Sequence, residues 1–571
     1  MSPEPTHSEE TTPLLPKSPT RSINSTTDHD ALLTRQTIAI RVSVICILSV
    51  LLVEIGDFML QAPLARTLED IICRDYYSSA PLSGFSDAPR LSIPESHCKN
   101  DVIQGKLAML RGWDGTLACI PGLILSVPFG ILADKIGRKT VLFMSLIGLS
   151  LGLIWVQVIC EFLNLLELRW RWDQAVVVEV IGWLGPTILT AIHDGIGYFD
   201  TFFDVRWIWS ANLLALIGGG SAVTKTMYYT IIADVVAEEQ RATVFFQIVS
   251  ASLIATLAGV PLAWWLIKVS SLRAPMMAAV LFVLLGALLV LLLPETLHLR
   301  EHLRISSPDT DQAQEEVIEY EGSSTEDEGA LTFSRKNWSM LLEKFEESRF
   351  VFTNPKLLAL SATFLVQSLH GMMNQFLLQL ASKRLGWSLA DASFLIPLAS
   401  ITNFVQLVFV LPAIYGILSR FHLQAAVKDL TVSRGSALLM ALGSLGLAVS
   451  PLEVYSSFVS RHYFTTIIFS LGMGLHPAIR SLLTDLVDPT QVSRLYGVLA
   501  VMETIGGMVS SPLVAGAFSS GLKKGGLWSG GGFLVAAVAY AAAGLLTLSV
   551  SVKKDESITH DDVNQVIDEE R

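Results

Sequence analysis

Long apolar stretches separated by short polar segments dominate this chain. Twelve of them are each close to the roughly 20 apolar residues that a helix needs to cross about 30 Å of hydrocarbon. They form two groups of six around a hydrophilic stretch, which keeps both ends of the chain on one side of the membrane. The predicted transmembrane helices are 38–62, 107–133, 140–162, 207–233, 243–268 and 274–293, then 357–381, 391–418, 433–452, 461–485, 494–518 and 528–551.

The composition fits a protein whose charges are confined to loops and tails. The 571 residues are 51% hydrophobic and 16% charged, with a mean hydropathy of +0.51, whereas a soluble domain carries about 25% charge. The net charge of −12 does not favour nucleic acid as a partner. No nucleophile–base constellation, metal-ligand cluster or Walker-type nucleotide loop is visible, so the sequence predicts neither an enzyme nor a cofactor. An ion gradient must then supply the energy for any transport.

The polar segments outside the spans define the remaining organisation. We expect 1–37 to be a disordered cytosolic tail, because it is polar and has no apolar core, and 552–571 to be a second cytosolic tail. The central segment 294–355 is predicted to be cytosolic and to carry an amphipathic helix on the membrane surface, since apolar residues recur at helical spacing from Trp338 to Phe345. The domain boundaries that follow are 38–293 for the first six-helix bundle and 356–551 for the second.

A short motif in the first tail resembles an acidic dileucine sorting signal, which a receptor reads as an address for the vacuole or endosomes. It consists of Glu10, Leu14 and Leu15. It implies a sorting adaptor as a partner, and the alternative is a chance match in a low-complexity tail.

Two loops on the extracytosolic side raise separate questions. The segment 168–205 contains an extra apolar stretch that would invert all later helices if it crossed the membrane once. We interpret it as an extracytosolic insertion that lies on or dips into the membrane; a gene-model artefact is the alternative. Cys73 and Cys98 share the first extramembrane loop, where either a disulfide or two free thiols fit an extracytosolic location.

The turn between the second and third predicted spans carries the most specific motif. It reads Gly130-Ile-Leu-Ala-Asp134-Lys-Ile-Gly137-Arg138-Lys139. Its basic residues indicate a cytosolic turn. The motif resembles the loop between helices two and three of the major facilitator superfamily. The resemblance implies an all-α membrane protein with 12 transmembrane helices in two pseudo-symmetric six-helix bundles, the major facilitator fold.

An internal repeat agrees with that arrangement. After the fourth span comes a turn with Asp234, Glu238 and Arg241, and after the tenth span comes a turn with Asp485 and Arg494. In both turns an Asp ends one helix and an Arg opens the next. Parallel repeats about an axis along the membrane normal are the layout of this superfamily.

These turns are expected to form a conformational latch on the cytosolic side. Arg138 can offer a bidentate guanidinium to Asp234 or Glu238, and Asp134 can accept hydrogen bonds from amides at a neighbouring helix N-terminus. Both glycines of the motif are expected to permit close helix approach and a tight turn. The alternative is a basic turn that only sets the topology.

Polar residues inside the spans are the candidates for binding substrate and protons, because they are rare in membranes and usually functional. Lys225 and His476 each lie nine residues before the Asp of a repeated turn, which is close to the membrane midplane. A structural ion pair for Lys225 and a packing role for His476 are the alternatives. The full set, on helices that the resemblance or the depth places at the cavity, is Glu54, Asp57, Gln61, Asp114, Lys225, Gln367, His370, Asn374, His476, Arg480 and Glu503.

Three of these groups are candidates for carrying a coupling proton, because removal from water favours the protonated form of a carboxyl group. They are Glu54, Asp57 and Glu503, with Glu54 or Asp57 preferred. Asp57 has a second interpretation, in which it lies near the outer surface and pairs with Arg66.

The sequence therefore predicts a secondary active transporter that moves a small organic solute by alternating access, coupled to protons, across the plasma or vacuolar membrane. The chain looks similar to fungal members of the superfamily that are distantly like proton-coupled folate and tetracycline-type transporters. Efflux of a metabolite or toxin is one direction, and uptake or vacuolar transfer of a nutrient is the other. A transporter-like sensor is a less favoured alternative.

Overall fold

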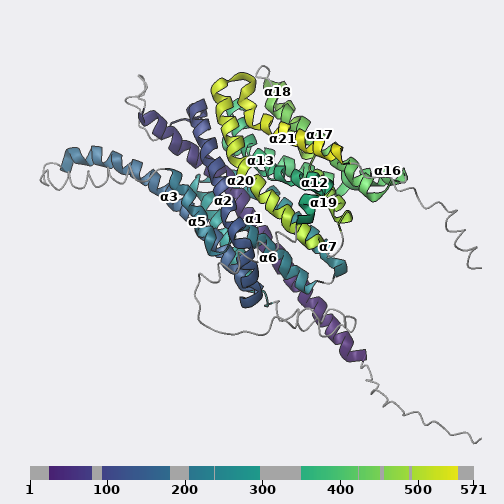
Figure 1. Cartoon of the computed structure of the whole chain (residues 1–571). Helices are drawn as coiled ribbons and strands as arrows, with labels where there is room; N and C mark the ends of the chain where they lie inside the picture. The colour runs from purple at the N-terminus through teal and green to yellow at the C-terminus, as the bar shows by residue number, and fades with distance from the viewer. Residues whose placement is uncertain are drawn as a thin grey trace, which may run out of the picture.

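The computed structural model describes residues 25–79, 93–180, 205–236, 238–295, 349–421, 423–449, 455–487 and 491–550. Its regular elements are helices, and most of them run lengthwise through the molecule (Figure 1). The N-terminal half contains α1 (Ser25–Ser79), η1 (Glu95–Lys99), α2 (Asp101–Ile136), α3 (Arg138–Val180), η2 (Val205–Ser210), α5 (Ala211–Leu214), η3 (Ala215–Ile217), α6 (Gly220–Val235), α7 (Glu238–Val269) and α8 (Arg273–Val290).

The C-terminal half repeats the alternation of long helices and short turns. It contains α11 (Arg349–Thr353), α12 (Pro355–Ala362), η5 (Thr363–Val366), α13 (Leu369–Leu385), α14 (Leu389–Ala392), α15 (Leu395–Val405), the π-helical turn η6 (Gln406–Val410), α16 (Leu411–Arg420), α17 (Ala425–Val449), α18 (Tyr455–Ser470), α19 (Leu475–Asp485), α20 (Val492–Lys524), η8 (Gly526–Gly530) and α21 (Gly531–Ser549).

The membrane-spanning architecture predicted from the sequence is confirmed. In the described part of the chain, nine helices are long and apolar enough to cross a bilayer, and α2 is a tenth when its two parts are taken as one bent span. The other two predicted spans, 207–233 and 357–381, are occupied by helices interrupted at η3 and η5. Interrupted helices are tolerated at membrane depth where they are packed against protein or line a cavity.

The break before α6 has a visible cause in packing. Gly219 and Gly220 adopt left-handed φ angles of 79° and 70°, which suit glycine. A Cβ on Gly218 would lie 2.2 Å from the Cα of Ser145, so the chain meets α3 here at backbone contact distance. The predicted span 207–233 is therefore made of several shorter helices, because this contact interrupts it.

Each half packs mainly within itself. In the N-terminal half α1 packs on α7 and α8, and α3 packs on α6 and α8; in the C-terminal half α17 packs on α18, α19 and α21. The principal contact between the halves joins α2 to α20, near the centre of Figure 1. A cavity between two such halves is where this architecture places a transported solute.

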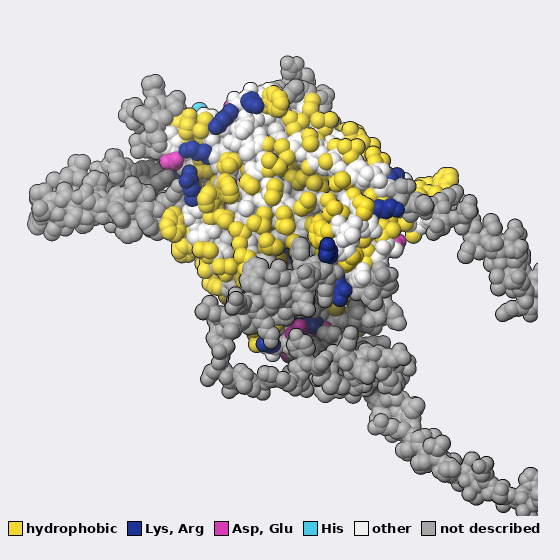
Figure 2. Space-filling view, viewed as in Figure 1, with side chains coloured by type: hydrophobic (Ala, Val, Ile, Leu, Met, Phe, Trp, Pro, Cys, Tyr) yellow, Lys and Arg dark blue, Asp and Glu magenta, His cyan; other side chains and the backbone are white. Residues whose placement is uncertain are grey.

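The surface has the polarity of a membrane protein. In the coloured part of Figure 2, hydrophobic side chains are spread across the whole face, and Lys and Arg lie toward its edges. On α8, exposed apolar side chains recur at spacings of three and four residues along one side, and the turn that follows adds one more: Met277, Leu281, Leu285, Leu288 and Leu292. Such a stripe is favourable against lipid and unfavourable against water.

Several predictions fall on residues outside the described part. These are the dileucine motif of Glu10, Leu14 and Leu15, the amphipathic helix from Trp338 to Phe345, and most of the insertion 168–205. At the start of that insertion, α3 continues as helix to Val180.

We call the end of the molecule that carries residues 134–139 the turn end, and the opposite end, where α2 begins, the disulfide end.

Candidate functional site

The turn between α2 and α3 is held by a buried ion pair. Arg138 pairs through Nη1 with the carboxylate of Asp234, and their side chains are only 6% and 5% exposed. The same guanidinium donates to the carbonyl of Thr230 at 3.2 Å. The ion pair therefore links the start of α3 to the end of α6. Asp234 is one of the two carboxylate partners that the sequence suggested for Arg138.

A second carboxylate at this turn was not among the predicted site residues. Glu295, which follows α8, accepts a hydrogen bond from the backbone N–H of Arg138 at 3.0 Å. Beside it, Lys139 donates through Nζ to the carbonyl of Leu291 at 2.8 Å. The sequence feature that could have pointed to Glu295 is the Pro-Glu-Thr sequence at the end of the sixth span. This sequence does not indicate which helix the carboxylate contacts.

The side chain of Asp134 is 66% exposed and contacts Arg138 at 3.5 Å, so it has an ionic partner within the turn; the side chains at the start of α7 lie outside the described residues. One expectation about the turn is wrong in this structure. At Gly130 no atom lies within 4 Å of an added Cβ, so this glycine does not serve close helix packing. Gly137 does, because it has a φ of 99° and a Cβ there would lie 2.5 Å from the carboxyl carbon of Glu295.

The equivalent turn in the C-terminal half is more open. Asp485 at the end of α19 and Arg494 near the start of α20 are both exposed. The two helices are joined across the turn by the hydroxyl groups of Thr484 and Tyr496, 2.9 Å apart. In the N-terminal copy, the side chains of Glu238 and Arg241 lie outside the described residues.

In the N-terminal half, polar side chains of α1 meet one cation of α6. Lys225 acts electrostatically on both Glu54 and Asp57. Glu54 also accepts a hydrogen bond from Ser252 of α7, and Asp57 is hydrogen-bonded to Gln61. Lys225 and Asp57 are exposed although they lie mid-helix, as expected for side chains that face a cavity.

The second interpretation of Asp57, in which it pairs with Arg66 near the outer surface, is wrong. The carboxylate partners of Arg66 are Glu69, Asp70 and Glu95. Asp57 instead belongs to the group around Lys225.

The C-terminal half contributes a matching pair of charges. Arg480 of α19 lies between two aromatic rings, 5.4 Å from the centre of Phe364 and 5.9 Å from that of Tyr496. Glu503 of α20 interacts electrostatically with Arg480 and with Lys225. Charges from both halves therefore converge on one region, which is what a central solute site requires.

Apart from Arg480, the predicted polar residues in and beside α13 and α19 are less exposed than Lys225. His476 is buried, with its Nε2 3.3 Å from the carbonyl of Thr363 and its ring edge-on to Phe364. This geometry is that of a packing histidine. His370 stacks on Phe469 and approaches Asn374 at 3.5 Å. The Oε1 of Gln367, which lies just before α13, is buried without a hydrogen-bond partner among the described residues.

Asp114 belongs to a different group, between α2 and α5. It accepts a hydrogen bond from Asn212 at 2.8 Å and interacts with the charge of Arg111, one turn earlier. It is therefore not brought to the group around Lys225, although the sequence placed it among the cavity acids. Among the described residues, no cluster of three or more His, Cys, Asp or Glu side chains could hold a metal ion.

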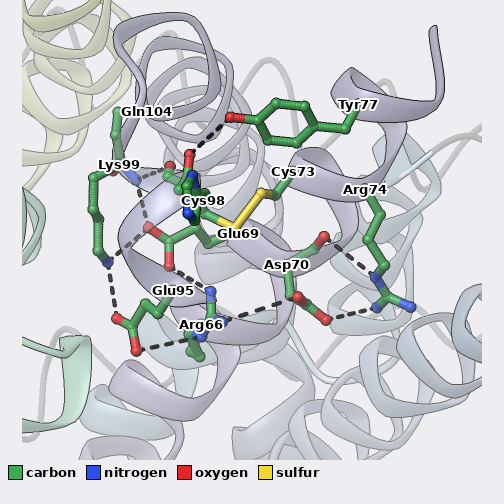
Figure 3. Close-up of a disulfide and its surroundings, with 11 residues drawn as sticks. Arg66, Glu69, Asp70, Cys73, Arg74, Tyr77, Glu95, Cys98, Lys99 and Gln104 are labelled. Carbon is green, nitrogen blue, oxygen red and sulfur yellow. Dashed lines mark hydrogen bonds and ion pairs between the residues drawn. A yellow bond between two sulfur atoms is a disulfide. The ribbon is translucent and has the colours of Figure 1, made fainter. Parts of the chain in front are cut away.

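The disulfide end carries a compact charged network (Figure 3). Cys73 of α1 and Cys98 of η1 form a disulfide with a Cα–Cα distance of 5.4 Å. One turn away from Cys73, the fully buried carboxylate of Glu69 contacts Arg66 and Lys99, each at 2.8 Å. The two cations neutralise this buried carboxylate, which would otherwise be costly in the interior.

Comparisons with known proteins agree with this architecture. The family model described as Major Facilitator Superfamily matches residues 181–475. The chain is 29% identical to the "MFS efflux pump atnC" of Emericella nidulans, over 90% of this chain and 89% of that protein. It is 26% identical to the "Efflux pump ustT" of Aspergillus flavus, over 85% and 83%. A crystal structure of a D-xylose–proton symporter superposes with a TM-score of 0.54 at 12% identity, covering 88% of this chain and 96% of that one.

Proposed function

The chain belongs to the major facilitator superfamily and is a multi-pass secondary transporter, and we propose that it exports a small organic solute in exchange for protons. The observation that carries this proposal is the position of Lys225. This one cation of the N-terminal half acts on Glu54 and Asp57 of α1 and on Glu503 of the opposite half. With Arg480 beside Glu503, three acids share two cations, so the arrangement favours a proton on one of the acids.

The charge arrangement suggests how solute and proton exclude each other. When Glu54 or Asp57 takes up a proton, it no longer offers a negative charge to a basic solute, and Lys225 loses a counter-ion and can contact Glu503 instead. When the proton leaves, the carboxylate recovers Lys225. Since Glu503 lies on the other half, this exchange changes the attraction between the halves. Coupling of this kind needs two states that bind proton and solute differently.

The direction of transport is proposed from the relatives. Two fungal proteins that align over most of this chain carry efflux-pump names. Export of a metabolite or toxin is therefore our proposal, and uptake of a nutrient or transfer into the vacuole is the alternative.

The proposal is tested in proteoliposomes with an imposed pH gradient. Because the solute is not identified, fluorescein and rhodamine 6G serve as anionic and cationic probes, and proton movement is followed with an entrapped pH-sensitive dye. The wild-type protein is compared with Glu54→Gln and Asp57→Asn. Glu161→Gln is the matched control, because Glu161 pairs with Arg273 on the exposed surface. Coupled flux in the wild type that is lost in the two cavity variants supports the proposal; flux that ignores the gradient in the wild type contradicts it.

We also propose that the turn end faces the cytosol, with both termini. The basic residues of the turn favour this side, and a disulfide at the opposite end suits an oxidising compartment. Whether the membrane is the plasma or the vacuolar membrane depends on the first tail. Replacing Leu14 and Leu15 by Ala in a fluorescent fusion tests this: a shift from vacuole to cell surface supports an adaptor at this motif, and unchanged vacuolar location contradicts it.

A further inference from the structure

The disulfide end is closed by contacts between the two halves. The carboxylate of Glu95, in η1, accepts a hydrogen bond at 2.9 Å from the backbone N–H of Leu389, the first residue of α14. Asp101, at the start of α2, forms an ion pair with Lys383 at the end of α13. Both contacts join the N-terminal half to the short connection between α13 and α14.

A third contact reaches the same connection from α7. The Nε1 of Trp264 donates to Asp391 at 2.9 Å, and Lys268 lies 4.0 Å from the same carboxylate. Segments far apart in the N-terminal half, η1, α2 and α7, therefore converge on residues 383–391 of the C-terminal half. We call this set of contacts the disulfide-end gate.

The N-terminal side of this gate is rigidly built. Glu95 is held by Lys99 at 2.9 Å and by Arg66 at 3.6 Å, and both cations also contact the buried Glu69 (Figure 3). The disulfide fixes Cys98, the residue directly before Lys99, to α1. The position of Glu95 is therefore set by a cross-link and by a buried carboxylate, and not by the loop alone.

The C-terminal side offers a group that needs this partner. The first N–H groups of a helix have no acceptor within the helix. Ser388 satisfies the N–H of Asp391, whereas the N–H of Leu389 is satisfied by Glu95 from the other half. When the halves separate at this end, water can replace Glu95, so the contact is suited to being broken and remade.

We propose that η1, which the disulfide holds on α1, is the part of the N-terminal half that makes and breaks the disulfide-end gate. Glu95 binds the backbone N–H of Leu389 when the disulfide end closes and releases it when this end opens. The disulfide has a positioning role in transport in addition to any contribution to folding. Alternating access requires the halves to part at each end in turn, and this contact lies where they must part.

The test measures separation of the halves directly. Spin labels are attached at Val102→Cys and Trp528→Cys, exposed positions on α2 and η8 at the disulfide end, in a Cys119→Ser background. Pulsed dipolar spectroscopy then gives the distance distribution in proteoliposomes. Loss of a hydrogen bond to a charged group is expected to raise the open population of Glu95→Ala by roughly tenfold. Glu95→Gln retains an acceptor oxygen and is expected to lie nearer the wild type.

Two further variants complete the test. Cys73→Ser/Cys98→Ser is expected to broaden the distribution toward longer distances. Lys106→Gln is the matched control, because Lys106 pairs with Asp75 at this end but within the N-terminal half. A distribution in Glu95→Ala that equals that of the wild type overturns the proposal, even if the double serine variant fails to reach the membrane. The outcome does not depend on proton coupling, since no solute or pH gradient is used.

Discussion

Glu295 accepts a hydrogen bond from the backbone N–H of Arg138, so the segment after α8 caps the start of α3. A carboxylate at this position satisfies an N–H that the helix cannot satisfy itself and complements the helix dipole. The same arginine pairs through its side chain with Asp234. Arg138 is therefore held at both its backbone and its guanidinium, by the ends of two different helices.

Removing the cap should weaken the N-terminal half. We expect Glu295→Ala to lower stability by about 1 kcal/mol, the usual cost of losing a side-chain cap, and Glu295→Gln to lower it less because the amide oxygen still accepts. The measurement is the thermal unfolding midpoint in detergent, followed by the loss of the monodisperse peak. An unchanged midpoint for Glu295→Ala would show that water replaces the carboxylate without loss.

The two glycines of the turn should respond in opposite ways to substitution by alanine. Gly137 has a left-handed φ and no room for a Cβ next to Glu295, so Gly137→Ala should cost at least about 1–2 kcal/mol from backbone strain alone. Gly130 lies within α2 with open space around it, so Gly130→Ala should be neutral or stabilising. Comparing the two unfolding midpoints checks this, and similar losses at both positions would contradict the structure.

The two aspartates near Arg138 should also differ. Asp234→Asn leaves a buried guanidinium without its carboxylate and is expected to cost about 3–5 kcal/mol. Asp134→Asn removes an exposed partner, and the expected loss is about 0–1 kcal/mol. The double variant Arg138→Gln/Asp234→Asn should be less harmful than the sum of the single variants, because each removes the charge that the other leaves unpaired. Equal effects of the two Asp variants on the unfolding midpoint would count against this difference.

The sequence predicted the spans well because apolar length is a local property that the bilayer thickness fixes. It did not predict the breaks at η3 and η5, because a break such as that at Gly218 depends on contact with Ser145 in another helix. The partner of Arg138 was suggested by a repeated turn, whereas Glu295 lies 157 residues away along the chain, and no pattern links the two. Gly130 and Gly137 are equivalent as letters of a motif, and only the fold distinguishes them.

For the candidate cavity, too, the sequence identified residues but not all of their contacts. The sequence placed Glu54 and Asp57 in the first span and Lys225 near the membrane midplane; the structure brings the three together. Depth alone also selected His476, which is buried against Phe364 and Thr363. Residue type and depth identify polar groups inside the membrane, but they do not tell a cavity wall from a packed interior.

The balance of charge around Lys225 leads to the last prediction. Lys225→Met leaves Glu54 and Asp57 without their cation, so one of them is expected to keep a proton throughout the cycle. Proton movement coupled to probe flux should then fall by at least tenfold in proteoliposomes, whereas binding of the probe need not be lost.

In the double variant Lys225→Met/Glu54→Gln the lost cation is matched by a lost anion, and Asp57 remains able to titrate. We therefore expect partial recovery of coupling in the double variant, a non-additive effect typical of residues in one network. Coupling that falls further in the double variant than in Lys225→Met would indicate that Glu54 carries the proton itself, with no help from Asp57.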